Sequence, residues 1–340
     1  MTLPEPRKPK DANGPARVWS IDILICEGFV LTEISALLEV FRIANRVLAQ
    51  PPFRWTVRSA AGGRIGCRAG LSIESETYVS RPDADFAFVL GNSDPAHPGL
   101  SCARVIQSYT SRGAKVFLLA EAAARYISEQ GSGAGRRTTH WENSALLRER
   151  LGLADAAHAL ACEDGPIVTC AGMGATTDIA LALVGQLTSA AAQMTVANIL
   201  LHEQVRDYGS LQPFAGAKPT ITGDSELDHC IRIMQANIEE PVPIRGIVAA
   251  LGISNRSLER KFKTYLATTP NGFYREMRLS RANNLLLNTT MSVREIGLAC
   301  GFPNGFSSLY KGFFGITPFT LRKRRRLGGP LPNEILQAGE

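Results

Sequence analysis

The residues of this 340-residue chain that are best suited to chemistry are polar and basic side chains along one short segment. Asn255, Arg256, Glu259, Arg260 and Lys263 recur at intervals of three and four, so a helix would present them on one face. Arginine and asparagine form paired hydrogen bonds with base edges in the major groove of DNA, and lysine and arginine neutralise its phosphates. The pattern predicts a DNA-reading surface. The alternative is the solvated charged face of an ordinary helical hairpin.

Two short helices joined by a tight turn would position this surface. Apolar residues have the spacing of one helical face over Ile244–Leu251, and Gly252, which readily takes a positive φ, ends that helix. Ser254 can cap a second helix, in which Leu258 and Phe262 lie four residues apart on the buried side. A helix, a glycine turn and a second helix with outward basic residues are typical of a helix-turn-helix.

A second segment, Ser292–Pro318, repeats this pattern. Ser292 and Glu295 have the spacing of a capping box, Gly301 turns the chain, and another helix follows. The candidate DNA contacts of that helix are Asn304, Ser307, Ser308 and Lys311. Between the two motifs, Pro270–Asn288 has the pattern of one long helix. We expect its exposed residues to include Arg275, Arg278 and Arg281.

In these features the last third of the chain resembles the two-motif DNA-binding domain of the AraC/XylS family. The matching segments are Ala249–Ser254, Leu258–Phe262, Arg278–Ala282, Glu295–Ile296, Ala299–Phe302 and Phe314–Pro318. The resemblance implies double-stranded promoter or operator DNA and RNA polymerase as partners.

The second motif departs from the family pattern. Leu309–Phe313 runs almost directly into Phe314-Gly315, about one helical turn sooner than in the family. We therefore expect a short second recognition helix that is interrupted by Gly312, because glycine is a poor helix residue. Base readout should then depend mainly on the first motif.

Positive charge is concentrated in the same region. Residues 241–326 contain fifteen Lys and Arg against three Asp and Glu, so the rest of the chain is acidic although the whole carries +6. A basic module on an acidic body is the electrostatic pattern of a nucleic-acid-binding protein. The run Arg322–Arg326 is either a solvated tail or a further set of phosphate contacts, and we favour the contacts.

Buried strands and helices alternate through the preceding part of the chain. The expected strands are Val18–Cys26, Phe53–Ala60, Asp85–Leu90, Lys115–Ala120 and Pro166–Cys170. The expected helices are Ile34–Val47, Cys102–Arg112, Glu121–Glu129, Trp141–Leu151, Thr177–Gly185 and Ala191–Arg206. The alternation predicts an α/β fold, a flavodoxin-like parallel sheet covered on both faces, followed by an all-α domain with two helix-turn-helix motifs. Ligands of such sheets bind at the carboxyl ends of the strands, here at residues 91–93, 120–121, 138–141 and 170–174.

Residues 18–206 also resemble the PfpI-like, class I glutamine amidotransferase-like fold. The resemblance rests on Gly28-Phe29, Phe41–Asn45, Arg136–Trp141, Asp164–Gly172 and Asp178–Ala182. It implies a nucleophilic cysteine at the turn after Lys115–Leu119, but Ala120 occupies that position. A nucleophile needs this turn and an adjacent base, so we expect no catalysis. His140 could be a base but has nothing to activate.

The same loops predict a pocket for a small effector. Its candidate residues are Asn92, Ala120, Glu121, Thr139, His140, Trp141, Cys170, Ala171 and Gly172. The Trp141 indole suits a cationic amine and His140 suits a carboxylate, while a capping histidine and a tryptophan at the core edge are the alternative. Cys170 is either a buried thiol or a pocket residue.

Such a body joined to an AraC-type module resembles the GlxA type of regulator. The segments that match members controlling breakdown of quaternary amines and amino acids are Arg42–Asn45, Trp55, Cys170–Gly172, His202–Arg206 and Gln212. The implied function is a transcriptional regulator, an activator, that responds to an amine, a betaine or an amino acid. Two alternatives remain: an amidase or hydratase fused to a DNA-binding module, and a constitutive DNA-binding protein whose body only dimerises.

Composition limits these interpretations. The Pro-rich start lacks the apolar core of a signal peptide, no apolar run is long enough to span a bilayer, and the seven cysteines form no CxxC pair or Cys/His cluster. We therefore expect a cytoplasmic protein without a metal, a cofactor or a membrane partner, and a homodimer is the default assembly. The expected divisions are a disordered lead-in (1–16), a sensor domain (17–209), a flexible linker (210–223), a DNA-binding domain (224–326) and a tail (327–340).

Overall fold

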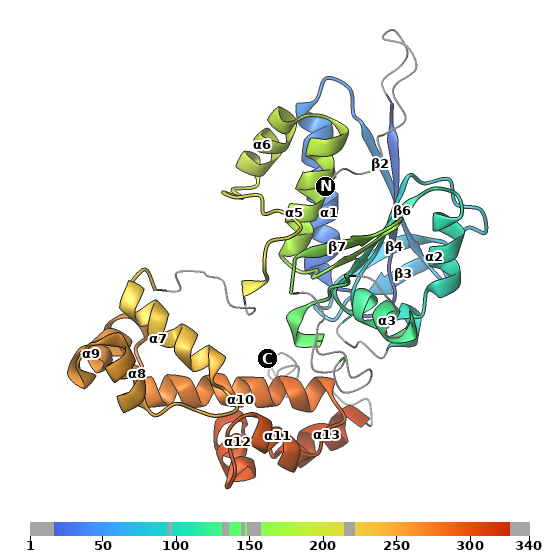
Figure 1. Cartoon of the computed structure of the whole chain (residues 1–340). Coiled ribbons are helices and arrows are strands. Elements are labelled where there is room, and N and C mark those ends of the chain that lie inside the picture. The colour runs from blue at the N-terminus through green and yellow to red at the C-terminus, as the bar shows by residue number, and fades with distance from the viewer. Residues whose placement is uncertain are drawn as a thin grey trace. The chain divides into compact units, whose positions relative to one another are not determined.

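The computed structural model describes residues 17–92, 94, 97–130, 136–143, 147, 158–213 and 222–326. The expected lead-in and tail, and residues 214–221 of the expected linker, lie outside this part. The chain divides into two compact units, residues 1–212 and residues 213–340. Each unit is described by itself, with element labels as in Figure 1.

A twisted eight-stranded sheet forms the centre of the N-terminal unit, with the strand order β3-β4-β2-β1-β5-β6-β8-β7. The strands are β1 (Trp19–Leu24), β2 (Phe53–Ser59), β3 (Gly63–Gly66), β4 (Ser72–Thr77), β5 (Phe86–Val89), β6 (Lys115–Leu119), β7 (Ala161–Asp164) and β8 (Ile167–Cys170). The six strands from β4 to β8 in this order are parallel, and the outer strands β3 and β7 are antiparallel to their neighbours. Because parallel strands need crossover connections, helices cover both faces of this sheet.

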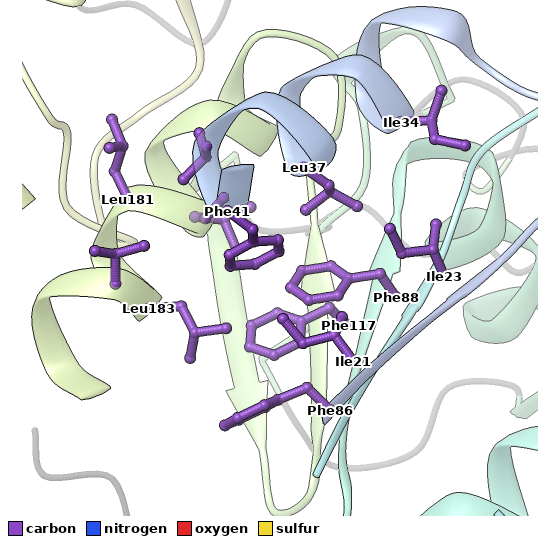
Figure 2. Close-up of a cluster of buried hydrophobic side chains, with 14 of the residues drawn as sticks. Ile21, Ile23, Ile34, Leu37, Phe41, Phe86, Phe88, Phe117, Leu181 and Leu183 are labelled. Carbon is purple, nitrogen blue, oxygen red and sulfur yellow. The ribbon is translucent and has the colours of Figure 1, made fainter. Parts of the chain in front are cut away.

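The helices of this unit are α1 (Leu31–Val47), α2 (Ala103–Thr110), α3 (Ala120–Gln130), α5 (Ala175–Leu187) and α6 (Ala190–Ile199). Helices α1, α5 and α6 contribute to the core on one face of the sheet, and α2 and α3 to the core on the other. Figure 2 shows the first core, in which Leu37 and Phe41 of α1 lie over Phe88 and Phe117 of the central strands. Phe88 and Phe117 stack with ring centroids 4.5 Å apart.

The C-terminal unit is entirely helical in the part that the structure describes. Its helices are α7 (Ser225–Ala236), α8 (Ile244–Leu251), α9 (Asn255–Leu266), α10 (Pro270–Asn288), α11 (Val293–Ala299), α12 (Phe306–Phe314) and α13 (Pro318–Arg326). Figure 1 shows α10 as the long helix that joins the pair α8 and α9 to the pair α11 and α12. The predicted fold class is therefore confirmed, as a mostly parallel α/β sheet unit followed by a helical unit with two helix-turn-helix motifs.

Several expected elements differ from the structure. Strands β3, β4 and β7 were not predicted, because they are short and carry polar residues. The helix expected over Ala191–Arg206 ends at Ile199, because the chain turns at Leu201 and then binds Asp178 through His202 and Arg206. Of the helix expected over Trp141–Leu151, the structure describes a 3₁₀ turn at Trp141–Asn143 and the single residue Leu147.

Two expectations about the helical unit were wrong. Gly312 does not interrupt α12, which continues to Phe314, because aromatic contacts of Tyr310 and Phe314 hold the last turn in place. Arg278 is not exposed: its guanidinium lies 4.1 Å from the centre of the Phe302 ring and donates hydrogen bonds to the carbonyls of Cys300 and Gly301. Arg281 is half-buried as well, whereas Arg275 is exposed.

No helix among the residues that the structure describes is long and apolar enough to cross a membrane. All seven cysteines are free thiols, six of them buried and Cys26 half-buried.

Candidate functional site

The candidate DNA-reading surface lies on α9. Ser254 caps this helix by accepting a hydrogen bond from the Ser257 amide at 3.1 Å, and Gly252 before it has a φ of +66°. Leu258 and Phe262 are fully buried in the core of the unit. The opposite face is exposed and holds all five residues expected there: Asn255, Arg256, Glu259, Arg260 and Lys263.

One basic residue of α9 does not belong to this surface. The Lys261 ammonium forms ion pairs with Asp224 and, at 3.2 Å, with Glu226, and its side chain is only 18% exposed. Asp224 is the N-cap of α7 and also accepts hydrogen bonds from the amides of Glu226 and Leu227. Lys261 therefore attaches α9 to the start of α7 and is withdrawn from the face that would meet DNA.

The second motif presents a smaller surface. The expected capping box of Ser292 and Glu295 is present at the start of α11. Helix α12 has nine residues against twelve in α9, as the short second motif predicted. Its four candidate contacts are all exposed: Asn304, Ser307, Ser308 and Lys311. A hollow beside the start of α12 is lined by Arg294 together with Asn304, Ser307 and Ser308.

The carboxyl edge of the sheet carries the second candidate site, which is built around a buried carboxyl group that was not predicted from the sequence. Glu33, at the start of α1, accepts hydrogen bonds from the Gly91 amide at 2.7 Å and from the Met173 amide at 3.0 Å. Glu33 is fully buried, and its two hydrogen bonds join the loop after β5 to the loop after β8. Glu33 has the helical spacing of Leu37, Phe41 and Ala44, so the sequence places an ionisable residue on the apolar stripe of α1. That pattern could have identified Glu33 as a buried site residue.

A second buried carboxylate lies beside the first. Glu121, at the start of α3, is 7% exposed, and its Oε1 accepts a hydrogen bond from Asn143 Nδ2 at 3.4 Å. A methyl group added at Gly91 would collide with Glu121 Oε2 and lie 3.3 Å from Glu33 Oε2, so the two carboxylates flank the same glycine. Burial and repulsion from Glu121 raise the pKa of Glu33 to about 8. Burial raises the pKa of Glu121 to about 7.

Ala120 occupies the turn between β6 and α3 in a strained conformation. Its φ is +41°, a value that favours glycine, and its side chain is fully buried. The Thr139 hydroxyl donates a 2.6 Å hydrogen bond to its carbonyl. A methyl group added at Gly172 would collide with Glu33 and with Ala120 Cβ, so this glycine permits the close packing of the site. The turn retains the sharp geometry expected for a nucleophile but presents a methyl group.

The loop 138–141 and its support complete the site. The Gln212 side chain accepts a hydrogen bond from the Trp141 amide at 2.9 Å and donates to the carbonyls of Thr139 at 2.8 Å and Ala159 at 3.1 Å. Gln212 is 2% exposed and is the last residue of the N-terminal unit. The first residues of the expected linker are thus held by this unit, and this structural role of Gln212 was not predicted.

The remaining candidate residues differ in how deeply they are buried. Trp141 and His140 are half-buried, with ring centroids 5.6 Å apart, and burial lowers the pKa of His140. Asn92 is fully buried and binds the carbonyl of Glu27. Ala171 is buried next to Cys170, whose thiol is fully buried, and this burial raises its pKa well above the usual value. The described residues form no cluster of three or more side chains that could hold a metal ion.

Comparison with known proteins places the helical unit in a family. The model of the helix-turn-helix domain family matches residues 247–324. The HTH-type transcriptional regulator GbdR of Pseudomonas aeruginosa is 29% identical over 346 residues, which cover 97% of this chain and 90% of that protein. The HTH-type transcriptional regulator GlxA of Rhizobium meliloti is 27% identical over 90% of this chain and 96% of its own.

A solved structure, an AraC family transcriptional regulator from Pseudomonas putida, is 22% identical and covers 54% of this chain and 99% of its own, with a TM-score of 0.47. GbdR and GlxA, which match over nearly the whole chain, are both named as transcriptional regulators.

Proposed function

Because the chain belongs to the AraC family of helix-turn-helix transcriptional regulators, we propose that its N-terminal unit is a sensor for a small metabolite. Binding at the carboxyl edge of the sheet would change how the helical unit acts on promoter DNA, and we propose activation as the outcome. The regulator works in the cytoplasm as a homodimer that contacts RNA polymerase.

The observation that carries the sensor role is a site with two buried carboxyl groups but no attacking group. Glu33 and Glu121 flank Gly91, and the turn beside them carries the methyl group of Ala120. The thiol of Cys170 is inaccessible and protonated at neutral pH, because burial raises its pKa. A site that holds polar groups without a nucleophile supports recognition rather than turnover.

The chemistry of the site favours an amine, a betaine or an amino acid as effector. A cationic head group would be attracted by the indole face of Trp141. Its charge would also lower the raised pKa values of the two buried carboxyl groups, so that they ionise and pair with it. His140 would face the carboxylate of a betaine or an amino acid. We propose that Asn92, Thr139, Ala171 and Gly172 shape the pocket through packing and backbone contacts.

A thermal-shift screen of amines, betaines and amino acids on the full chain tests this proposal. An effector at 100 times its dissociation constant should raise the free energy of unfolding by about 2.7 kcal/mol. A Trp141→Ala variant should lose most of that shift and keep operator binding in a gel-shift assay without effector. Its melting curve must show that it is folded, because tryptophan truncation in a core costs about 3–5 kcal/mol.

Two outcomes would contradict the sensor role. Turnover of a screened compound, or a covalent adduct on Cys170 detected by mass spectrometry, would favour the fused enzyme. Operator binding and transcription that no compound alters, together with no thermal shift, would favour a constitutive DNA-binding dimer.

A further inference from the structure

Arg278, on the long helix α10, holds the turn of the second helix-turn-helix motif. Its Nε donates a 2.9 Å hydrogen bond to the carbonyl of Cys300, and its Nη2 donates to the carbonyl of Gly301. Cys300 is the C-cap of α11, and Gly301 begins the turn that leads to α12. Both donors belong to one planar guanidinium, so they fix the direction of the contact as well as its distance.

The Arg278 guanidinium also lies close to aromatic rings of both motifs. It is 4.1 Å from the centre of the Phe302 ring and 5.8 Å from the centre of the Tyr274 ring. Tyr274 belongs to the buried core that includes Phe262 of α9, whereas Phe302 stacks on Phe306 of α12 with ring centroids 5.8 Å apart. Arg278 therefore contacts the core of the first motif and the turn of the second at once.

A second contact joins the same two motifs. The Tyr274 hydroxyl donates a hydrogen bond to the carbonyl of Asn237, the C-cap of α7. The segment that follows reaches the turn of the second motif: a methyl group added at Gly301 would lie 2.5 Å from Pro241 Cγ and 2.9 Å from the Ile238 carbonyl oxygen. Gly301 thus packs directly against the segment that leads into α8.

These contacts set the orientation of α12 relative to α9. Two recognition helices that bind one duplex must both enter the major groove, and groove segments on one side of DNA repeat about every 34 Å. Apolar packing is not directional, whereas paired hydrogen bonds from a guanidinium are. In Figure 1, α10 runs between the pair α8 and α9 and the pair α11 and α12, so a rotation at Arg278 would move one pair against the other.

We propose that Arg278 is a positioning residue that places α12 correctly on DNA when α9 is bound. It acts through Cys300 and Gly301 rather than through a contact with a nucleotide. This inference rests on the expectation that α12 meets DNA through Lys311. It adds a requirement for a planar pair of donors at position 278.

The cost of Lys311→Ala in two backgrounds tests this role, on a duplex that the native chain selects from a randomised pool. In the native chain at about 0.1 M salt, loss of one phosphate contact should weaken binding about fivefold to tenfold. In an Arg278→Met chain, whose α12 is no longer held in place, the same substitution should weaken binding less than about twofold. Arg260→Ala on α9 should cost the same factor in both backgrounds. A general loss of stability would not produce this selectivity, because it lowers the folded fraction in every measurement alike.

Three further variants separate the guanidinium geometry from charge and folding. Arg278→Lys keeps the charge but lacks the planar pair of donors, so it should restore only part of the Lys311 effect. Arg275→Met removes an exposed arginine from the same helix and should leave both costs at their native values. Gly301→Ala keeps Arg278 but forces the turn away from Pro241, so it should also reduce the Lys311 effect. Melting curves show which variants are folded, and Gly301→Ala serves as the test if Arg278→Met is not.

The outcomes distinguish this role from the DNA contact on which it rests. If Lys311→Ala has no effect in the native chain, then α12 does not meet DNA through Lys311, and the contact and the positioning role are both refuted. If Lys311→Ala costs the same in the native, Arg278→Met and Gly301→Ala chains, the positioning role alone is refuted. Full recovery in Arg278→Lys would refute the requirement for a planar pair of donors.

Discussion

Two buried carboxyl groups, Glu33 and Glu121, should make the stability of this molecule depend on pH. The pKa of Glu33 is raised to about 8 and that of Glu121 to about 7, mainly by burial. A carboxyl whose pKa is higher in the folded chain than in the unfolded chain binds its proton more tightly when folded. The free energy of unfolding should therefore fall as the pH rises from about 4.5, the unfolded value, to about 8.

Glu121→Gln should remove part of this pH dependence. At pH 5 the native carboxyl is already protonated and resembles the amide, so the variant should melt close to the native chain. At pH 8 the native side chain is ionised next to Glu33, and the variant should be more stable by about 1–3 kcal/mol. Thermal melts at both pH values measure this. Glu74→Gln, at a carboxylate whose side chain is 79% exposed, is the control and should shift neither melt. A variant that gains equally at both pH values would contradict the assignment.

Some features of the site could be predicted from the sequence, and others depend on distant residues. Ala120, Glu121 and Thr139 were found because strand ends are the expected place for a ligand, and the structure brings all three together. Glu33 was not found, and Gln212 was noted only as a match to regulators of the GlxA type and not as part of the site. Gln212 reaches Trp141 across 71 positions of the chain, and no local pattern reports such a contact.

At the scale of elements, periodic helices and buried strands could be predicted from the sequence. The ends of helices and the edge strands of the sheet could not. Leu258 and Phe262 of α9 revealed its buried face because their spacing follows the helical period. The strand β3 is only four residues long and half of it is exposed, so no alternation marks it. The prediction that Gly312 interrupts α12 was wrong because the low helix propensity of glycine costs less free energy than the packing of Tyr310 against Phe314 contributes.

The exposed face of α9 should discriminate between DNA sequences. Arg256→Ala or Arg260→Ala should weaken binding to the operator more than binding to random DNA, by about 1–3 kcal/mol for a paired contact with a base. Lys311→Ala on the shorter α12 should weaken both to a similar degree. Competition gel shifts with operator and scrambled duplexes measure the difference. Equal losses on both duplexes for the arginine variants would mean that these residues contact phosphates only.

The two neighbouring lysines of α9 should behave differently. Lys263 is exposed. Lys263→Ala should therefore reduce the slope of the logarithm of DNA affinity against the logarithm of salt concentration by about one counterion. Lys261 is already neutralised by Asp224 and Glu226, so Lys261→Ala should leave that slope unchanged. Binding isotherms between 50 and 200 mM salt, about the range in which phosphate contacts dominate, measure both slopes. A reduced slope for Lys261→Ala would mean that the lysine leaves its carboxylates to bind DNA.

At the scale of the whole molecule, Gln212 is the last residue of the N-terminal unit and holds the Trp141 loop, so we expect it to transmit effector binding along the chain. Gln212→Leu removes the acceptor of the Trp141 amide and the donor to the Thr139 carbonyl, which should loosen the loop 138–141 at a cost of about 1–3 kcal/mol. We expect operator binding without effector to remain and the response to effector to weaken. Reporter transcription and operator gel shifts with and without effector measure this, with exposed Gln107→Leu as the control. A full response in a folded Gln212→Leu variant would place the coupling elsewhere.

The attachment of Gln212 to the Trp141 loop also has a consequence in the reverse direction. If an effector in that loop alters operator affinity by some factor, then operator DNA must alter effector affinity by the same factor, since coupling free energies are reciprocal. A coupling of about 1–3 kcal/mol corresponds to about 5–150-fold. A regulator seated on its promoter would then respond at a different metabolite concentration from the same regulator free in solution. The DNA site, as well as the protein, would set the threshold of the signal.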